Sequence, residues 1–105
     1  MKLTSDRGKF DGLQMYLTGQ IVETVYEALG GAGIPKRKRQ ELATRVAFNV
    51  CAAIDGSLIM KHKGKDVVPI LTFAADKKQS TLIHNDGPSD MHEYVHGAAD
   101  DVFGK

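Results

Sequence analysis

The chain has 105 residues, 42% of them apolar and 26% charged, with a formal net charge of +1. These values are ordinary for one globular domain over residues 1–105, and they exclude collagen-like, low-complexity and wholly disordered chains. The sequence holds one cysteine, Cys51, no apolar run near the roughly 18 residues of a membrane span, and no signal-peptide pattern, so we expect a cytoplasmic protein without disulfides.

The first predicted element is a helix from about residue 11 to residue 29, preceded by a flexible leader over residues 1–9. One apolar stripe recurs every four residues and is expected to face the core of the domain: Leu13, Leu17, Ile21 and Val25. A second stripe lies on an adjoining face: Met15, Val22, Tyr26 and Leu29. Since the two stripes together cover more than half of the helix, we expect it to pack on two sides. The glycine-rich run 30–33 ends it, because glycine adopts the left-handed conformation of a helix stop.

A second helix is predicted from Pro35, which suits the first turn of a helix, to about Ile54. Its buried face is expected to consist of five apolar residues: Leu42, Val46, Val50, Ala53 and Ile54. Three small residues lie beside that face: Ala43, Ala47 and Cys51. Cys51 lies mid-helix among small residues, which favours a packed thiol over a nucleophile. Phe48 falls on the opposite, polar face, and the pair Asp55-Gly56 closes the helix.

The pattern then changes to that of strands, at residues 58–60, 67–73 and 80–83, with turns at 63–65 and 75–78. We interpret them as a small antiparallel meander of two or three strands. A third helix begins near Ser89 or Asp90, where Asp90 and Glu93 resemble a capping box. The predicted fold class is therefore α+β, with two N-terminal helices, the meander, and one C-terminal helix covering a face of the sheet.

The third helix carries the pattern H-E-x-x-H at 92–96, which resembles the signature of the zincin metalloproteases. The resemblance implies a zinc ion held by His92 and His96, with Glu93 as the general base. A catalytic zinc needs a third protein ligand. Where one zincin branch has glycine and histidine, this chain has Ala99 and Val102, and it ends before the glutamate of the other branch. We therefore assign no catalytic residue and keep a zinc-dependent hydrolase as an alternative.

Basic residues gather at two places, 36–39 and 61–65. Residues 34–65 hold eight Lys and Arg against two acids, whereas residues 84–105 hold five acids against one lysine. The first cluster opens a helix, where cations oppose the helix dipole, so a bound anion would stabilise it: Lys36, Arg37, Lys38 and Arg39. No aromatic residue is interleaved with either cluster, which disfavours nucleic-acid binding and leaves it as a third alternative.

The main functional expectation is a non-enzymatic domain that acts through self-association or protein–protein interaction, without a cofactor. The first helix has more apolar surface than one layer of a small domain covers, and an uncovered patch favours association. The expected interface combines its second stripe with the misplaced aromatic residue of the second helix: Met15, Val22, Tyr26, Leu29 and Phe48. A two-fold homodimer is the expected assembly, since that symmetry is the commonest among soluble oligomers.

Overall fold

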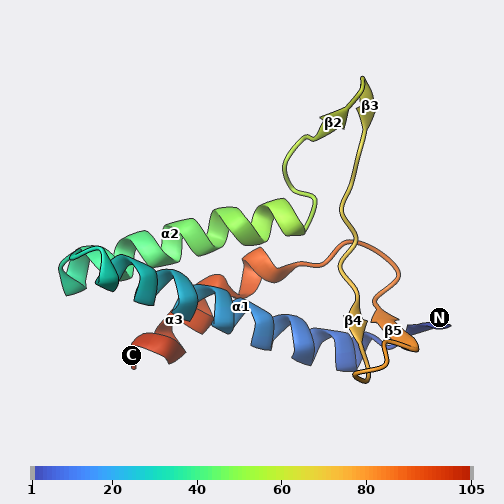
Figure 1. Ribbon diagram of the computed structural model, residues 1–105, viewed down its shortest axis with the longest axis horizontal. Helices are drawn as coiled ribbons and strands as arrows, with labels where there is room; N and C mark the ends of the chain where they lie inside the picture. Colours follow the sequence, from blue (N-terminus) through green and yellow to red (C-terminus); the bar gives the residue numbers. More distant parts are fainter. Residues whose placement is uncertain (1, 105) are drawn as a thin grey trace.

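The computed structural model describes residues 2–104 and has the predicted α+β class (Figure 1). The helices are α1 (Arg7–Gly31), α2 (Lys36–Ile54), the 3₁₀ turn η1 (Met91–Tyr94) and α3 (Val95–Phe103). The strands are β1 (Lys2–Ser5), β2 (Lys61–His62), β3 (Lys65–Asp66), β4 (Phe73–Ala74) and β5 (Thr81–His84). Two N-terminal helices and one C-terminal helix are confirmed. Within residues 2–104 no helix is both long enough and apolar enough to cross a lipid bilayer.

Helix α1 begins at Arg7, four residues before the predicted start, because Asp6 caps it. The Asp6 carboxylate accepts a hydrogen bond of 3.0 Å from the backbone N–H of Lys9, which satisfies one of the unpaired donors of the first turn. At the other end the predicted glycine stop is confirmed, since α1 ends at Gly31 and Gly33 has a positive φ of 82°. Residues 2–9, expected to precede the first element as a leader, belong to β1 and the start of α1.

The main sheet has the strand order β1-β5-β4. The predicted hairpin is present as the antiparallel pair β4–β5, and its turn is held by Asp76, whose carboxylate accepts from the Ser80 hydroxyl at 2.8 Å. The third strand is β1, which pairs with β5 in parallel, Lys2 lying opposite Thr81, so the sheet is mixed and not the predicted antiparallel meander. Residues 58–60, predicted as a strand, join neither sheet. The predicted turn near residue 63 joins β2 and β3, with positive φ at Lys63 and Gly64.

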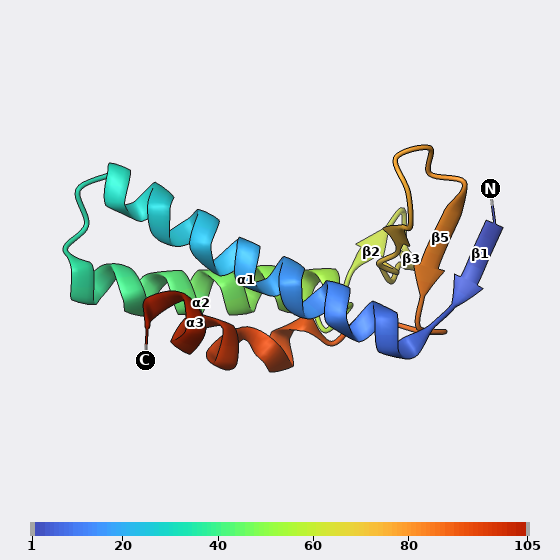
Figure 2. The same cartoon turned by 90° about the horizontal axis from the view of Figure 1, so that it is seen from below.

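The three helices pack against one another, with α3 lying across both α1 and α2 (Figure 2). We expected α3 to cover the sheet; instead it completes a helical core made of six buried residues: Val22, Ala47, Cys51, Met91, Val95 and Ala99. The buried face of α2 is the one that carries its small residues, and not the predicted face that carries its valines. Val46 and Val50 are each 39% exposed, whereas Ala43, Ala47 and Cys51 are fully buried. Small side chains allow the axes of neighbouring helices to approach closely, so the face that carries them turns inward.

Helix α1 also turns a different face to the core from the one predicted. Its buried residues follow one another at intervals of four: Phe10, Gln14, Thr18 and Val22. The stripe assigned to the core from Leu13 to Val25 is only partly buried. Val22 is fully buried in this chain's own core, which corrects its assignment to an interface with a partner.

The thiol of Cys51 is packed, as predicted. Its side chain is fully buried, and burial together with the negative charge of Asp55 raises the pKa of the thiol to about 11, despite a hydrogen bond with Thr18 that lowers it. A thiol protonated at neutral pH is a poor nucleophile. Cys51 is therefore a core residue.

The difference between Val22 and Val46 gives a direct test of which helix faces are buried. Val22→Ala should lower the free energy of unfolding by about 2 kcal/mol, because it leaves a cavity in the core. Val46→Ala, the same substitution at a partly exposed site, should cost about 0.5 kcal/mol. Urea unfolding followed by circular dichroism measures both values. Equal losses at the two sites would contradict the packing described.

Candidate functional site

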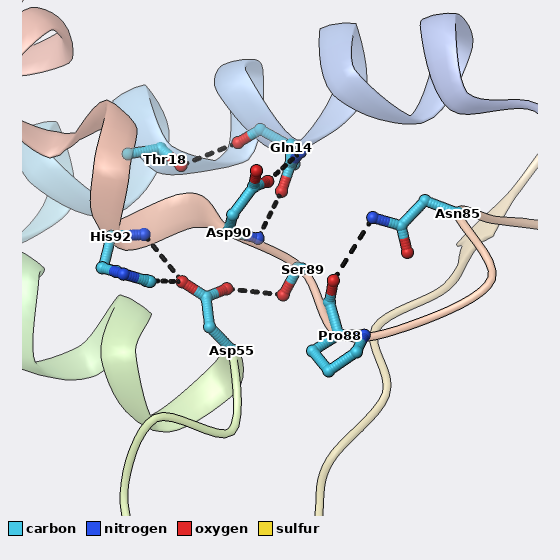
Figure 3. A network of polar contacts seen from close by, with 8 residues as sticks. All are labelled: Gln14, Thr18, Asp55, Asn85, Pro88, Ser89, Asp90 and His92. Carbon is cyan, nitrogen blue, oxygen red and sulfur yellow. Dashed lines mark hydrogen bonds and ion pairs between the residues drawn. The ribbon is translucent and has the colours of Figure 1, made fainter.

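The carboxylate of Asp55 lies at the centre of a buried polar network between the end of α2 and the start of η1 (Figure 3). Its side chain is 1% exposed. One carboxylate oxygen accepts from the Ser89 hydroxyl at 2.5 Å. The other accepts from the backbone N–H of His92 at 2.7 Å and contacts ring atom Nδ1 of His92 at 2.6 Å. Every acceptor that Asp55 presents to the interior therefore has a donor.

These contacts determine the charge of Asp55 and the tautomer of His92. Burial by itself raises the pKa of Asp55, but the hydrogen bonds from Ser89 and His92 outweigh it, and the pKa lies below its ordinary value of 3.8. An ionised carboxylate can only accept hydrogen bonds, so Nδ1 of His92 carries the proton. In the neutral ring the second nitrogen, Nε2, then has a free lone pair. Within residues 2–104 no hydrogen bond to this Nε2 is formed.

A second polar link ties η1 to α1. The side-chain amide of the buried Gln14 donates to the Asp90 carboxylate at 2.6 Å, and its oxygen accepts from the Asp90 backbone N–H at 3.0 Å. Asp90 is thereby occupied, and its side chain makes no capping hydrogen bond to η1. The capping box predicted for Asp90 and Glu93 is therefore wrong, because the longer-range contact with Gln14 replaces the local one.

The side chain of Phe48, on α2, lies beside the two histidines of the H-E-x-x-H pattern. Its ring centre is 5.8 Å from that of His92 and 6.3 Å from that of His96. Phe48 was expected on the polar face of the second helix. It is 37% exposed and borders a groove of about 690 Å³ between α2 and α3. The groove is lined by polar and aromatic residues that include Arg37, Arg45, Asn49, His96 and Phe103.

The histidines come from two kinds of helix, since His92 and Glu93 belong to η1 and His96 to α3. Glu93 is exposed. Among the described residues no three side chains of His, Cys, Asp or Glu converge in a way that could hold a metal ion. The two imidazoles are thus brought to the same side of α2 without a third protein ligand beside them.

The basic cluster 36–39 opens α2, whereas the cluster 61–65 lies at the β2–β3 hairpin, beyond the other end of that helix. A helix of 19 residues rises about 28 Å, so the clusters do not form one surface. In the first cluster Arg39 stacks over the Tyr26 ring at 4.5 Å and Lys38 lies 4.0 Å from Glu41. Lys36 and Arg37 are exposed. In the second cluster Lys61 pairs with Asp66 across the β2–β3 hairpin at 3.2 Å.

The five residues predicted to form an interface are dispersed. Val22 is buried, and Tyr26 packs against Phe103 with ring centres 4.9 Å apart. Leu29 is partly buried, whereas Met15 is exposed on α1. These residues do not make one continuous exposed face.

Five of the eleven large exposed apolar side chains among the described residues lie elsewhere, on residues 57–72, which we call the arm. The arm leaves the end of α2, turns at the β2–β3 hairpin and returns, standing away from the helices (Figure 1). Its large exposed apolar side chains are Leu58, Ile59, Val67, Val68 and Ile70, and Ile59 is 90% exposed. The radius of gyration of 15.4 Å exceeds the roughly 13 Å typical of a compact domain of this length. The apolar residues of the arm are visible in the sequence, but an apolar run next to a turn equally predicts a buried strand, so the sequence did not show that they are exposed.

The two legs of the arm meet at its base. Gly56 has a positive φ of 77°, and a Cβ built there would lie 2.9 Å from Val68 Cγ1. Only glycine accommodates both the backbone conformation and the returning leg. The arm is thus held at its base, and Leu71 also packs against the helical core, whereas the five large apolar side chains from Leu58 to Ile70 are exposed.

Comparison with protein-family models, with curated proteins and with solved structures found no match.

The Asp55 network predicts a specific dependence of stability on pH. Because the pKa of Asp55 is lower in the folded chain, its contribution is present above pH 4 and is lost as the pH falls through the folded-state pKa. Asp55→Asn should lower the free energy of unfolding by about 1–3 kcal/mol at pH 7, with the difference shrinking below pH 4. Urea unfolding at a series of pH values measures this difference.

The matched control is Asp66→Asn on the exposed hairpin, which should change the free energy of unfolding little at any pH. A constant difference between the wild-type chain and Asp55→Asn from pH 7 to pH 2.5 would contradict the role given to the ionised carboxylate.

Proposed function

We propose that this chain is a non-enzymatic cytoplasmic subunit that self-associates as a two-fold homodimer through its arm. The observation that carries the proposal is the row of five large apolar side chains on the arm, from Leu58 to Ile70, which are 41–90% exposed. Relative to the expectation from the sequence, the contact surface moves from α1 to the arm.

The free energy of apolar burial favours a covered arm. Burying one large aliphatic side chain contributes about 1.5–3 kcal/mol, and the arm exposes five of them. Monomeric proteins seldom leave a contiguous apolar patch of this kind in water, since it promotes aggregation. A protein partner is therefore the expected environment of these side chains.

The backbone of the arm supports a second copy as that partner. Residues 67–72 connect β3 to β4 and belong to neither sheet. The N–H of Val67 donates to the Met60 carbonyl at 3.0 Å and Pro69 has no N–H, but the other backbone N–H and C=O groups of this segment can pair with another chain. Two identical arms can pair about a two-fold axis, each giving the other the same residues. An association of this kind satisfies the backbone and buries the apolar side chains together.

Charge complementarity points to the same occupant. The arm tip carries Lys63 and Lys65 without an acidic partner among the described residues, while Asp100 and Asp101 are exposed on α3. A second copy therefore offers acidic residues to the basic tip. The attraction is modest at physiological salt, so it orients the two chains more than it holds them.

The other functions considered from the sequence have less support. The basic clusters are separated by the length of α2, which gives a nucleic acid no single basic surface. A zinc-dependent hydrolase would require a third metal ligand from a described residue, and none lies beside the two histidines.

The proposal is tested by the mass of the chain in solution. Sedimentation equilibrium at micromolar concentration should give twice the chain mass for the wild type. Ile59→Asp combined with Val68→Asp should raise the dissociation constant by at least about 30-fold, as expected for residues central to an interface.

The control is Tyr16→Asp, which places one aspartate on an exposed aromatic residue of α1 away from the arm, and it should leave the dimer intact. A monomer mass for the wild type at 100 µM would contradict the proposal, as would a control variant that dissociates as readily as the arm variant.

A further inference from the structure

We infer that His92 and His96 form a two-imidazole site for a divalent transition metal of the zinc class, with Asp55 as the carboxylate behind the first ligand. The site lies within one chain and does not depend on the proposed dimer. It requires neither Glu93 as a base nor a hydrolytic activity.

The orientation of His92 carries this inference. A histidine that ligates a metal ordinarily donates its other ring N–H to a carboxylate, which fixes the ring and makes the ligand nitrogen more basic. His92 has this arrangement already, since Nδ1 lies 2.6 Å from Asp55 and Nε2 is left free. The carboxylate is itself held in place by Ser89 and by the His92 backbone.

The second ligand is His96, four residues further along, where α3 follows η1. The ring centres of the two imidazoles lie 5.8 and 6.3 Å from that of Phe48, so both rings face α2. His96 is exposed, and its side chain has the freedom to turn toward Nε2 of His92. Histidines at this sequence spacing share one zinc ion when their rings face the same side.

The groove beside His96 carries charges of both signs. Asp100 lies one further turn along α3 and lines the same groove as His96, so its carboxylate is available to a metal-bound water. Arg37 and Arg45 also line the groove and oppose a cation, but they leave the remaining coordination positions accessible to an anionic ligand. Imidazole nitrogens suit zinc, copper and nickel, and calcium and magnesium prefer oxygen ligands. The site is therefore selective by ligand type and open to solvent.

The test is calorimetric titration of untagged protein with zinc chloride at pH 7.5, with magnesium chloride as the comparison. We expect saturable binding of one zinc ion per chain and no response to magnesium. His96→Ala should abolish binding, and this substitution is at an exposed residue that the core does not need. His62→Ala, at the exposed tip of the arm, should leave binding unchanged.

The role of Asp55 is tested separately. Asp55→Asn should weaken zinc binding by about 10–100-fold, which is the usual cost of removing a carboxylate behind a ligating histidine. Circular dichroism shows whether the variant is folded, and Ser89→Ala, which removes a contact to the other oxygen, should weaken binding less.

The Ile59→Asp and Val68→Asp variant distinguishes this site from the dimer, since binding should persist in it at one ion per chain. No saturable binding up to 1 mM zinc, or loss of binding in His62→Ala rather than His96→Ala, would overturn the inference.

Discussion

The carboxylate of Asp55 connects two parts of the chain that are far apart in sequence. It lies at the end of α2, and its partners Ser89 and His92 lie where the third helical segment begins, 34 and 37 residues later. The intervening residues form the arm, β4 and β5. Because the carboxylate is buried with all its acceptors used, losing one partner leaves a charge without compensation. The position of α3 over the other helices therefore depends on this network, and so does the orientation of His92.

A second consequence of the network is that the two chain segments on either side of the stretch that contains the arm, β4 and β5 are joined by a hydrogen bond. The chain leaves the helical core at Asp55 and returns to it at Ser89, and these two side chains are in hydrogen-bond contact. The arm can therefore move or pair with another chain while the helices keep their packing. Among its apolar residues, Leu71 packs against the core formed by α1, α2, η1 and α3, whereas the five exposed ones from Leu58 to Ile70 are not part of that core.

The features predictable from the sequence were those determined by neighbouring residues. The glycines after α1, the pair Asp55-Gly56 after α2, and the turn at Lys63-Gly64 all depend on local backbone conformation, and each prediction is confirmed. The buried face of α1 was misassigned because two of its members, Gln14 and Thr18, are polar. Their burial depends on hydrogen bonds to Asp90 and to the backbone, which hydrophobic periodicity does not detect.

Only the part of the candidate site that depends on neighbouring residues was predictable from the sequence. The spacing of His92 and His96 is visible in the sequence, whereas Asp55 looks like a turn residue until the fold places it behind His92. The pairing of β1 with β5 was equally hidden, because it joins residues at opposite ends of the chain.

That pairing determines the order in which parts of the chain can form during synthesis. Strand β1 leaves the ribosome first, but its partner Thr81 follows Lys2 by 79 residues, which takes several seconds at roughly 5–20 residues per second. Helices α1 and α2 have all their mutual contacts available long before that. The N-terminal strand is therefore made early and paired late, and until β5 emerges its backbone edge is open to any other extended chain nearby.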